Sequence, residues 1–136
     1  MPVKAIVSIL GTVAFVAGVF FITRPGADRE KASGGLRETR PVLAAGQFSG
    51  KTAMAYQYAA EIPVVIDRQF CYCYCEKNFN HKSLLTCFVG DHGAECGICQ
   101  DEVIRSYELR RSGASIEEIK KAIDAEFGAN PAGHAG

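Results

Sequence analysis

The sequence predicts a mainly α-helical protein with an N-terminal transmembrane helix, a flexible linker and a small cysteine-rich helical domain. Three observations support this prediction: an uncharged apolar run near the N-terminus, apolar residues at helical spacing in the second half, and six cysteines confined to residues 71–99. The length of 136 residues allows one domain with short additions. Because the formal net charge is zero, the composition does not indicate a nucleic-acid partner.

The apolar run occupies residues 5–23 and reads AIVSILGTVAFVAGVFFIT. A helix of about 20 apolar residues spans the hydrocarbon core of a bilayer. A cleaved signal peptide is the alternative, since Lys4 provides a positive flank. Yet the run is longer than an ordinary h-region, and no A-x-A-like cleavage site follows it. We therefore predict that residues 1–23 form an uncleaved membrane anchor or signal-anchor of a single-pass protein.

The residues alone leave the side of the membrane open. More basic residues follow the anchor than precede it, and a positive-inside count therefore keeps the domain in the cytoplasm. A very short N-terminal tail before a single apolar segment is instead typical of export, and long domains are less sensitive to flanking charge.

Residues 24–50 are rich in Gly, Pro, Ala and charged residues and lack a sustained apolar period, which predicts a flexible linker. The sequence GQFSGKT near its end is close to a P-loop. However, three residues separate Gly46 from Gly50 where that motif has four. A nucleotide site is therefore not expected.

The first helix of the domain is predicted over residues 51–62. Met54, Tyr58 and Ile62 recur at four-residue steps and indicate an apolar stripe. Pro63 ends this helix. The following VVI, residues 64–66, is a short β-prone run that leads to the first cysteine.

Three more helices are expected. Ser83 is a candidate N-cap for a short helix that carries Leu84, Leu85 and Phe88, and the GDHG that follows is a turn. A longer helix begins at Cys96 and ends before Gly113, with a buried side marked by Ile98, Val103, Ile104 and Tyr107. Ser115 and Glu118 match a capping box for the last helix, whose apolar stripe is Ile116, Ile119, Ile123 and Phe127. The cysteine-rich domain thus spans residues 51–128, and residues 129–136 are expected to be disordered.

The sequence CYCYC places Cys71, Cys73 and Cys75 at alternate positions. In a flat strand their sulfurs would lie about 7 Å apart, too far to share one metal ion with bonds of about 2.3 Å. A loop is therefore predicted here, with two of the three thiols facing inward.

The sequence CGIC places Cys96 and Cys99 at the start of a predicted helix, where the helix dipole favours the thiolate. Thiolates of this kind attack disulfides and bind metals. His81 and His92 flank Cys87 and are candidate imidazole ligands, whereas His134 lies in the tail and is not expected to take part.

Three interpretations of the cysteines remain open. Six cysteines in a small exported domain can form three structural disulfides. Clustered thiolates can instead bind copper(I) or zinc. The C-x-C or C-x-x-C pairs can also act as exchangeable dithiols. No Ser–His–Asp set, paired-carboxylate motif or phosphate loop is visible, so an ordinary hydrolase is not expected.

In this order, FCYCYC, HKSLLTCF, HGAECGICQDEV and GASIEEIKKAID resemble the bacterial PCYCGC-motif, or CYCXC, family. Its members are small exported or lipid-anchored proteins without an assigned activity, and some are read as selenoproteins. Phe70 and Tyr74 stand where the family has proline and glycine, and the lipobox cysteine is absent. The resemblance implies an extracytoplasmic location and a reactive site built from Cys71, Cys73, Cys75, Cys87, Cys96 and Cys99, with His81 as a weaker addition.

We therefore predict a membrane-anchored, periplasmic domain that binds copper(I) or zinc through clustered thiolates. The predicted metal ligands are Cys71, Cys73, Cys75, Cys87, Cys96, Cys99 and His81. The first alternative is thiol–disulfide exchange, with Cys96 attacking and Cys99 resolving. The second is a non-catalytic, disulfide-stapled interaction domain. The expected partners are the membrane and a metal donor, metal acceptor or redox protein, and no nucleic acid.

Overall fold

The computed structural model describes residues 35–129. Within this range the chain forms α-helices and 3-10 helices and no strand, so the mainly helical class predicted from the sequence is correct there. The α-helices are α1 (Gly50–Glu61), α2 (Pro63–Asp67), α3 (Cys75–Phe79), α4 (Gly97–Arg111) and α5 (Ile116–Gly128). The 3-10 helices are η1 (Ala45–Gln47), η2 (Leu84–Phe88) and η3 (Asp91–Ala94).

The predicted anchor, residues 1–23, and most of the predicted tail lie outside the described residues. Among the helices of residues 35–129, none has the length and apolar character needed to cross a membrane.

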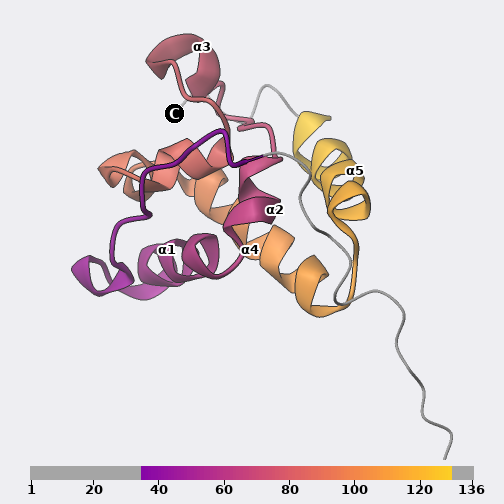
Figure 1. Cartoon of the computed structure of the whole chain (residues 1–136), viewed down its shortest axis with the longest axis horizontal. Coiled ribbons are helices and arrows are strands. Elements are labelled where there is room, and N and C mark those ends of the chain that lie inside the picture. The colour runs from indigo at the N-terminus through magenta and orange to yellow at the C-terminus, as the bar shows by residue number, and fades with distance from the viewer. Residues whose placement is uncertain (1–34, 130–136) are drawn as a thin grey trace, which may run out of the picture.

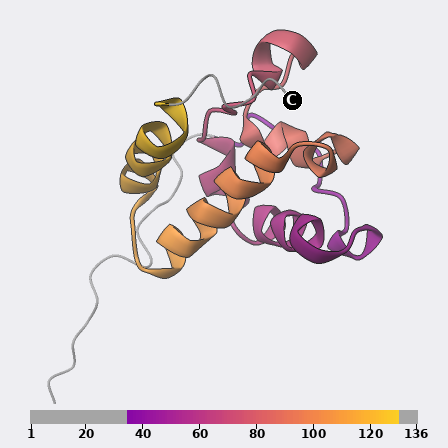
Figure 2. The same cartoon turned by 180° about the vertical axis from the view of Figure 1, so that it is seen from behind.

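The helix α4 is the central element of the domain. It crosses the molecule diagonally in Figure 2, with α1 on one side and α5 on the other, and it packs most extensively against these two helices. The short helix α3 projects at the top of Figure 1, away from α1. The cysteine-containing segments therefore gather at the end of the molecule where α3 lies.

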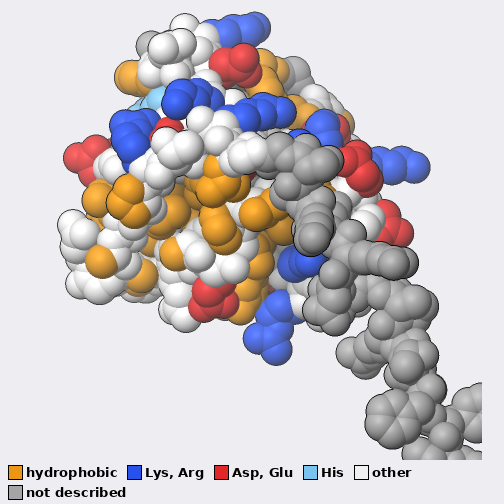
Figure 3. Space-filling view, in the orientation of Figure 1, with side chains coloured by type: hydrophobic (Ala, Val, Ile, Leu, Met, Phe, Trp, Pro, Cys, Tyr) orange, Lys and Arg blue, Asp and Glu red, His pale blue; other side chains and the backbone are white. Residues whose placement is uncertain are grey.

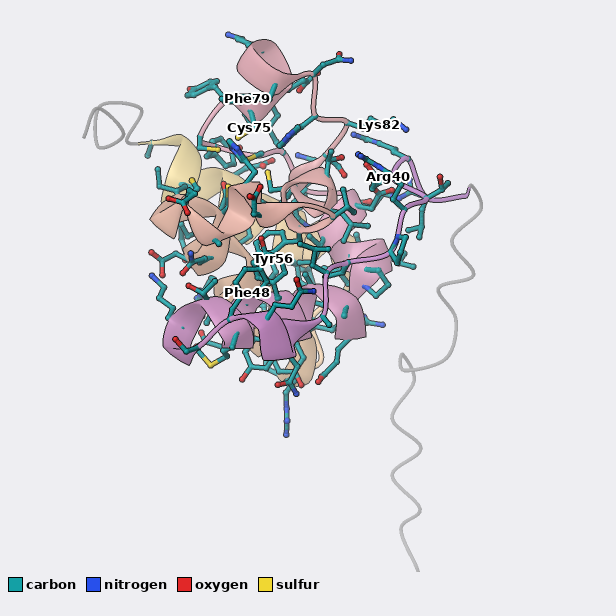
Figure 4. The ribbon with its side chains drawn as sticks, turned by 90° about the vertical axis from the view of Figure 1, so that its left-hand side faces the viewer. Arg40, Phe48, Tyr56, Cys75, Phe79 and Lys82 are labelled. Atoms are coloured by element: carbon teal, nitrogen blue, oxygen red, sulfur yellow. The ribbon has the colours of Figure 1, made fainter. Side chains whose placement is uncertain are left out.

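The main core is built around Tyr56 of α1, which is fully buried. Its ring stacks on Phe48 at 4.1 Å between centroids and meets the edge of Phe88 at 5.0 Å. Its hydroxyl donates a hydrogen bond to the carbonyl oxygen of Gly90 at 2.6 Å. Figure 4 shows Phe48 and Tyr56 side by side above α1. This aromatic group joins α1 to η2 and to Gly90, in the turn between η2 and η3.

The apolar stripe predicted for α1 is correct in part. Tyr58 and Ile62 are partly buried and pack against the core, whereas Met54 is 37% exposed. The fully buried side chains of this helix are Ala55, Tyr56 and Ala59, so its buried face is offset from the predicted stripe. Tyr58, at the edge of that face, stacks on Tyr107 of α4 at 3.7 Å between ring centroids.

The β-prone run at residues 64–66 is helical and belongs to α2. Pro63 ends α1 as predicted, but it also occupies the first turn of α2, where its missing N–H has no intrahelical partner to lose. Asp67 at the end of α2 accepts hydrogen bonds from the backbone N–H groups of Arg37 and Glu38 and from the Ser83 hydroxyl. The propensity of the valines for strands is thus overridden by the proline and by these tertiary bonds.

Residues 36–49, which the sequence assigns to a linker, pack against the helices. Glu38 is 1% exposed, and its carboxylate pairs with the Arg40 guanidinium at 2.7 Å. The backbone N–H of Leu43 donates to the carbonyl oxygen of Phe88 at 2.9 Å. This ordering comes from long-range hydrogen bonds and from an ion pair whose carboxylate is buried and whose guanidinium is exposed, which a composition rich in Gly, Pro and charge does not reveal.

The boundaries of the C-terminal helices follow the prediction closely, but the buried side predicted for α4 is correct only in part. Val103 is buried, whereas Ile98, Ile104 and Tyr107 are partly exposed; the other buried residues of α4 are Cys99, Gln100, Glu102 and Ser106. Cys96 is the N-cap of α4, and Gly113 after its end has φ 96°, a conformation that favours glycine. The capping box of Ser115 and Glu118 is present at the start of α5. The stripe of α5 buries Ile116, Ile119 and Ile123 against Val65 in a second, smaller core.

Candidate metal centre

The loop of residues 71–75 reverses direction and brings its three thiols together. The N–H of Tyr74 donates to the carbonyl oxygen of Cys71 at 2.9 Å, and Tyr74 itself is left-handed, with φ 59°. The Sγ atoms of Cys71 and Cys73 lie 3.1 Å apart, and those of Cys73 and Cys75 lie 2.6 Å apart. The expectation of two inward-facing thiols is corrected, since all three converge; Cys73 alone remains partly exposed.

Tyr72 holds this loop between α4 and α5. Its backbone N–H donates to Oε1 of Glu102 at 2.8 Å, and its hydroxyl donates to Oδ1 of Asp124 at 2.7 Å. A Cβ added at Gly128 would lie 3.1 Å from the Tyr72 ring, so the end of α5 sits tightly against it. The tyrosine between the first two cysteines therefore positions the thiols from outside the cluster.

The later cysteines reach the same place from other elements. Cys87 lies in η2 and is fully buried, with its Sγ 3.5 Å from that of Cys71. Cys99 lies in the first turn of α4 and is also fully buried, with its Sγ 3.4 Å from that of Cys71 and 3.3 Å from that of Cys73. Cys96 is half-buried, and its sulfur lies within 4.8 Å of those of Cys73 and Cys99.

All six cysteine sulfurs thus form one group, called here the sulfur cluster: Cys71, Cys73, Cys75, Cys87, Cys96 and Cys99. Figure 4 shows Cys75 beneath α3, with sulfur atoms gathered near it. None of the six is paired in a disulfide, and even the shortest separation is well beyond the bond length of about 2.05 Å. The structure therefore gives no support to a disulfide-stapled scaffold.

Both candidate histidines lie at the sulfur cluster. Nε2 of His92 is 2.8 Å from Sγ of Cys75, and Nδ1 of His81 is 3.2 Å from Sγ of Cys87. The two rings contact each other at 4.9 Å, and Phe79 of α3 covers His92 at 4.6 Å between centroids. Burial, together with the neighbouring His92, holds the pKa of His81 below its ordinary value, so the neutral imidazole that binds metals is favoured.

His92 is better placed than His81 to bind a metal ion, although the predicted ligand set included His81 and not His92. The Nε2 atom of His92 lies within 4.8 Å of the sulfurs of both Cys73 and Cys75, so these three atoms can surround one ion. His81 contacts a single sulfur in the described residues. The two histidines are equivalent in the sequence, because each flanks Cys87, and only the placement of η3 separates them.

The thiols share protons unequally. Hydrogen bonds from the thiols of Cys73, Cys87 and Cys99 lower the pKa of Cys71 far below its ordinary value. The same bonds raise the pKa values of Cys87 and Cys99, because their protons are held against the Cys71 sulfur. Without a metal ion, the buried sulfur cluster therefore concentrates its negative charge on few sulfurs.

Glu102 is a site residue that sequence reasoning missed. It lies one turn after Cys99 on α4 and is fully buried; its Oε1 accepts the N–H of Tyr72, while its Oε2 has no partner. Burial, and then the charge of Cys71, raise the pKa of Glu102 to about 10, so its neutral form is favoured at pH 7. The only sequence signal was its three-residue spacing from Cys99, which places both on one helix face.

A basic pocket opens beside the sulfur cluster. It has a volume of about 250 Å³ and reaches Cys71 and His81. Its basic lining residues are Arg37, Arg68, Lys82 and Lys120. Figure 3 shows Lys and Arg side chains gathered across the upper part of this face, next to a histidine, with hydrophobic side chains below them. This side of the sulfur cluster is therefore electropositive.

A family model described as a protein of unknown function with PCYCGC motif matches residues 37–134. Neither the curated proteins nor the solved structures contain a match to the chain. Phe70 and Tyr74, which stand where that motif has its proline and its glycine, contact each other at 5.8 Å between ring centroids. The chain belongs to the family of proteins of unknown function with a PCYCGC motif.

Proposed function

We propose that this domain binds a thiophilic metal ion through the sulfur cluster, with copper(I) favoured over zinc. One observation carries the proposal: the sulfurs of Cys71, Cys75, Cys87 and Cys99 all lie within 4.8 Å of one another, and all four residues are buried. In a tetrahedral site with metal–sulfur bonds of about 2.3 Å, neighbouring sulfurs lie about 3.8 Å apart. The four sulfurs need only small shifts to reach that geometry.

A bound cation would stabilise the buried thiolates of the sulfur cluster. A thiolate removed from water is costly unless an opposite charge compensates it, and a metal cation supplies that charge. Within residues 35–129, the sulfur cluster hydrogen-bonds to other thiols and to two histidines and to no Lys or Arg. A soft cation would therefore replace the shared protons.

Copper(I) fits the donor set better than zinc. Structural zinc sites close four ligands around the ion, whereas copper(I) is also stable with three soft ligands. Besides the set of four sulfurs, two sets of three donor atoms lie close enough to share an ion: Cys73, Cys75 and His92, and Cys73, Cys96 and Cys99. An extracytoplasmic location, proposed from the family resemblance, also suits a copper-handling role.

The predicted membrane anchor and periplasmic side belong to the same proposal. Residues 5–23 would hold the domain at the membrane, and a metal donor or acceptor protein would exchange ions with it. An impermeant maleimide added to intact cells should label the sulfur cluster after metal removal. Labelling only after lysis would contradict the outward orientation.

Thiol–disulfide exchange is the second candidate, and one distance favours a particular pair. The sulfurs of Cys73 and Cys75 lie 2.6 Å apart, and Cys73 is partly exposed. The pair named from the sequence, Cys96 and Cys99, has the same burial pattern, since Cys96 is also partly exposed and Cys75 and Cys99 are both buried. The short sulfur–sulfur distance alone therefore favours Cys73 and Cys75 as the exchanging pair.

Metal analysis with thiol counting separates these functions. The protein is purified without chelator under anaerobic conditions and analysed by elemental mass spectrometry, before and after incubation with copper(I) or zinc. Metal binding predicts stoichiometric metal and six titratable thiols after its removal. No metal uptake under any condition, together with a disulfide that exchanges with glutathione, would replace the metal proposal with the redox one.

A Cys99→Ser variant tests the site itself. Cys99 belongs both to the set of four buried sulfurs and to the set that it forms with Cys73 and Cys96. The loss of its sulfur should therefore abolish tight binding of at least one ion. The exposed Ser112 at the far end of α4 provides a control, Ser112→Ala, which should bind metal as the unchanged protein does.

A further inference from the structure

The number of donor atoms exceeds what one metal ion can use. Six sulfurs and one imidazole nitrogen fall into three overlapping groups, and the donor atoms within each group lie within 4.8 Å of one another. Two ligands of one ion cannot lie farther apart than twice the bond length, about 4.6 Å. A single tetrahedral ion would take four of the seven donors and leave the others without a metal.

The three groups share members in a regular way. The groups are Cys71, Cys75, Cys87 and Cys99; Cys73, Cys75 and His92; and Cys73, Cys96 and Cys99. Cys75 belongs to the first and second, Cys73 to the second and third, and Cys99 to the first and third. A thiolate sulfur has lone pairs for two metal ions, so each shared cysteine can bridge two centres.

From this pattern we propose that the domain holds three copper(I) ions in one cluster, joined in a ring by the bridging thiolates of Cys73, Cys75 and Cys99. This proposal rests on the metal-binding function proposed above and specifies its stoichiometry. The remaining donors are terminal: Cys71 and Cys87 complete the first centre, His92 the second and Cys96 the third. Each thiol that binds loses its proton to solvent, and no electron is transferred.

The ring donors come from two parts of the fold, the turn that leads into α3 and the first turn of α4. The sulfurs of Cys73 and Cys75 lie 2.6 Å apart, so they must separate by about 1 Å when one ion binds both. Cys73 comes from the turn before α3, Cys75 from the start of α3, and Cys99 from the first turn of α4. His92 is brought by η3, and Cys96 caps α4. Because these elements are fixed by the Tyr72 and Tyr56 contacts, the donors are gathered before any ion arrives.

Charge distinguishes copper(I) from a divalent ion in this cluster. Six thiolates would be neutralised by three divalent cations, whereas three copper(I) ions leave an excess of negative charge. The pocket beside Cys71 and His81 is lined by Arg37, Arg68, Lys82 and Lys120 and by one acid, Glu76. Lys120 is paired with Asp124, so the positive charge of the pocket rests mainly on the other three basic residues. The positive charge of this pocket complements the negative charge of a copper(I) cluster. A cluster of three divalent ions would be neutral, and the basic residues would then have no opposite charge beside them.

The test is native mass spectrometry of the reduced full chain titrated with copper(I) under anaerobic conditions, with X-ray absorption on the loaded protein. We expect three copper ions per chain and a copper–copper scattering shell. One or two ions per chain, or three without a copper–copper shell, would overturn the ring while leaving the proposed metal binding intact. No bound copper would overturn the ring, and no uptake of either copper(I) or zinc would overturn the proposed metal binding as well.

Two variants at half-buried positions assign the centres, because they perturb folding less than changes at buried cysteines. His92→Ala and Cys96→Ser should each reduce the stoichiometry from three ions to two, since each removes a terminal ligand of one centre. Cys73→Ser should lose at least two ions, because it belongs to two centres. Three ions retained by Cys73→Ser, with helical content unchanged by circular dichroism, would contradict the bridging role.

Discussion

At the scale of single residues, Tyr74 shows how the cysteine loop stores strain. Its φ of 59° is left-handed, a conformation that costs a residue with a Cβ about 1–2 kcal/mol. The family motif has glycine at this position, which adopts the conformation without that penalty. Contacts of the Tyr74 ring with Phe70 and with the Lys77 ammonium group partly compensate. The two departures from the motif are thus neighbours in space.

The strain at Tyr74 predicts an inverted preference between glycine and alanine. Both Tyr74→Gly and Tyr74→Ala remove the ring, so their difference isolates the backbone. We expect Tyr74→Gly to be more stable by about 1 kcal/mol, measured by urea denaturation. The same two substitutions at Tyr58, inside α1, should show the ordinary order, with alanine more stable by about 1 kcal/mol. If the alanine variant were the more stable one at both positions, the backbone of Tyr74 would not be strained.

The lowered pKa of Glu38 makes the stability of the fold depend on pH in the acid range. The hydrogen bond from the Arg40 side chain is the main reason that the pKa of Glu38 falls from 4.5 to about 2. A carboxyl with a depressed pKa stabilises the fold fully above its unfolded pKa, and this contribution is lost as the pH falls from about 4.5 towards 2.

Glu38→Gln should therefore lower the unfolding midpoint at pH 7 and flatten its decline between pH 4.5 and 2. Thermal melts across that range measure both effects. Arg40→Gln should flatten the decline in the same way, because it removes the largest cause of the shift. An unchanged acid limb in both variants would show that the ion pair does not contribute.

At the scale of elements, Asp67 joins three segments that are distant in sequence. Its carboxylate accepts two backbone N–H groups near residue 37 and the hydroxyl of Ser83, just before η2. Through these bonds α2 fixes both the segment before η1 and the segment that carries Cys87.

Asp67→Ala should destabilise the domain by about 3 kcal/mol, because it leaves buried donors without an acceptor. Hydrogen exchange should increase at residues 36–43 more than in α5, which packs in the second core. Asp101→Ala is a matched control: its carboxylate pairs with Lys51 at 2.7 Å with both side chains half exposed, and its loss should cost less than about 1 kcal/mol. Equal losses in the two variants would contradict the role given to Asp67.

The helices also differ in how far their sequences predict them. α4 and α5 carry their own boundary signals, Gly113 and the capping box of Ser115, and both were predicted. α1 was predicted in extent, and Tyr58 and Ile62 do pack against the core, but its fully buried face was missed because that face consists of alanines and one tyrosine. α2 was missed because its valines favour strands locally, while Pro63 and the bonds of Asp67 favour a helix.

At the scale of the whole molecule, the sulfur cluster lies where otherwise short elements meet. The loop before α3, η2, η3 and the start of α4 each contribute ligands, and none of these segments is long enough to be stable alone. Metal binding should therefore stabilise the fold as well as occupy a site, since it acts on all these segments at once.

Removing the metal should lower the unfolding midpoint of the loaded protein. At a thousandfold excess of free metal over Kd, binding contributes about 4 kcal/mol of stability. Calorimetry with and without a copper(I) chelator measures this change, and hydrogen exchange should increase mainly at residues 70–96. An unchanged midpoint in a protein shown to bind copper would mean that the site is equally formed in the unfolded chain.

The sequence by itself determined the helical class, the last two helices, the family and the choice of the six cysteines as the candidate site, because these depend on composition, capping signals and motif order. Tertiary structure alone decided that all six sulfurs meet, that His92 lies beside two of them, and that Glu102 is buried next to them. It also ordered residues 36–49 through Glu38 and Asp67. The physical reason is that these features depend on contacts between residues far apart in the chain, and local patterns carry no information about which distant groups become neighbours.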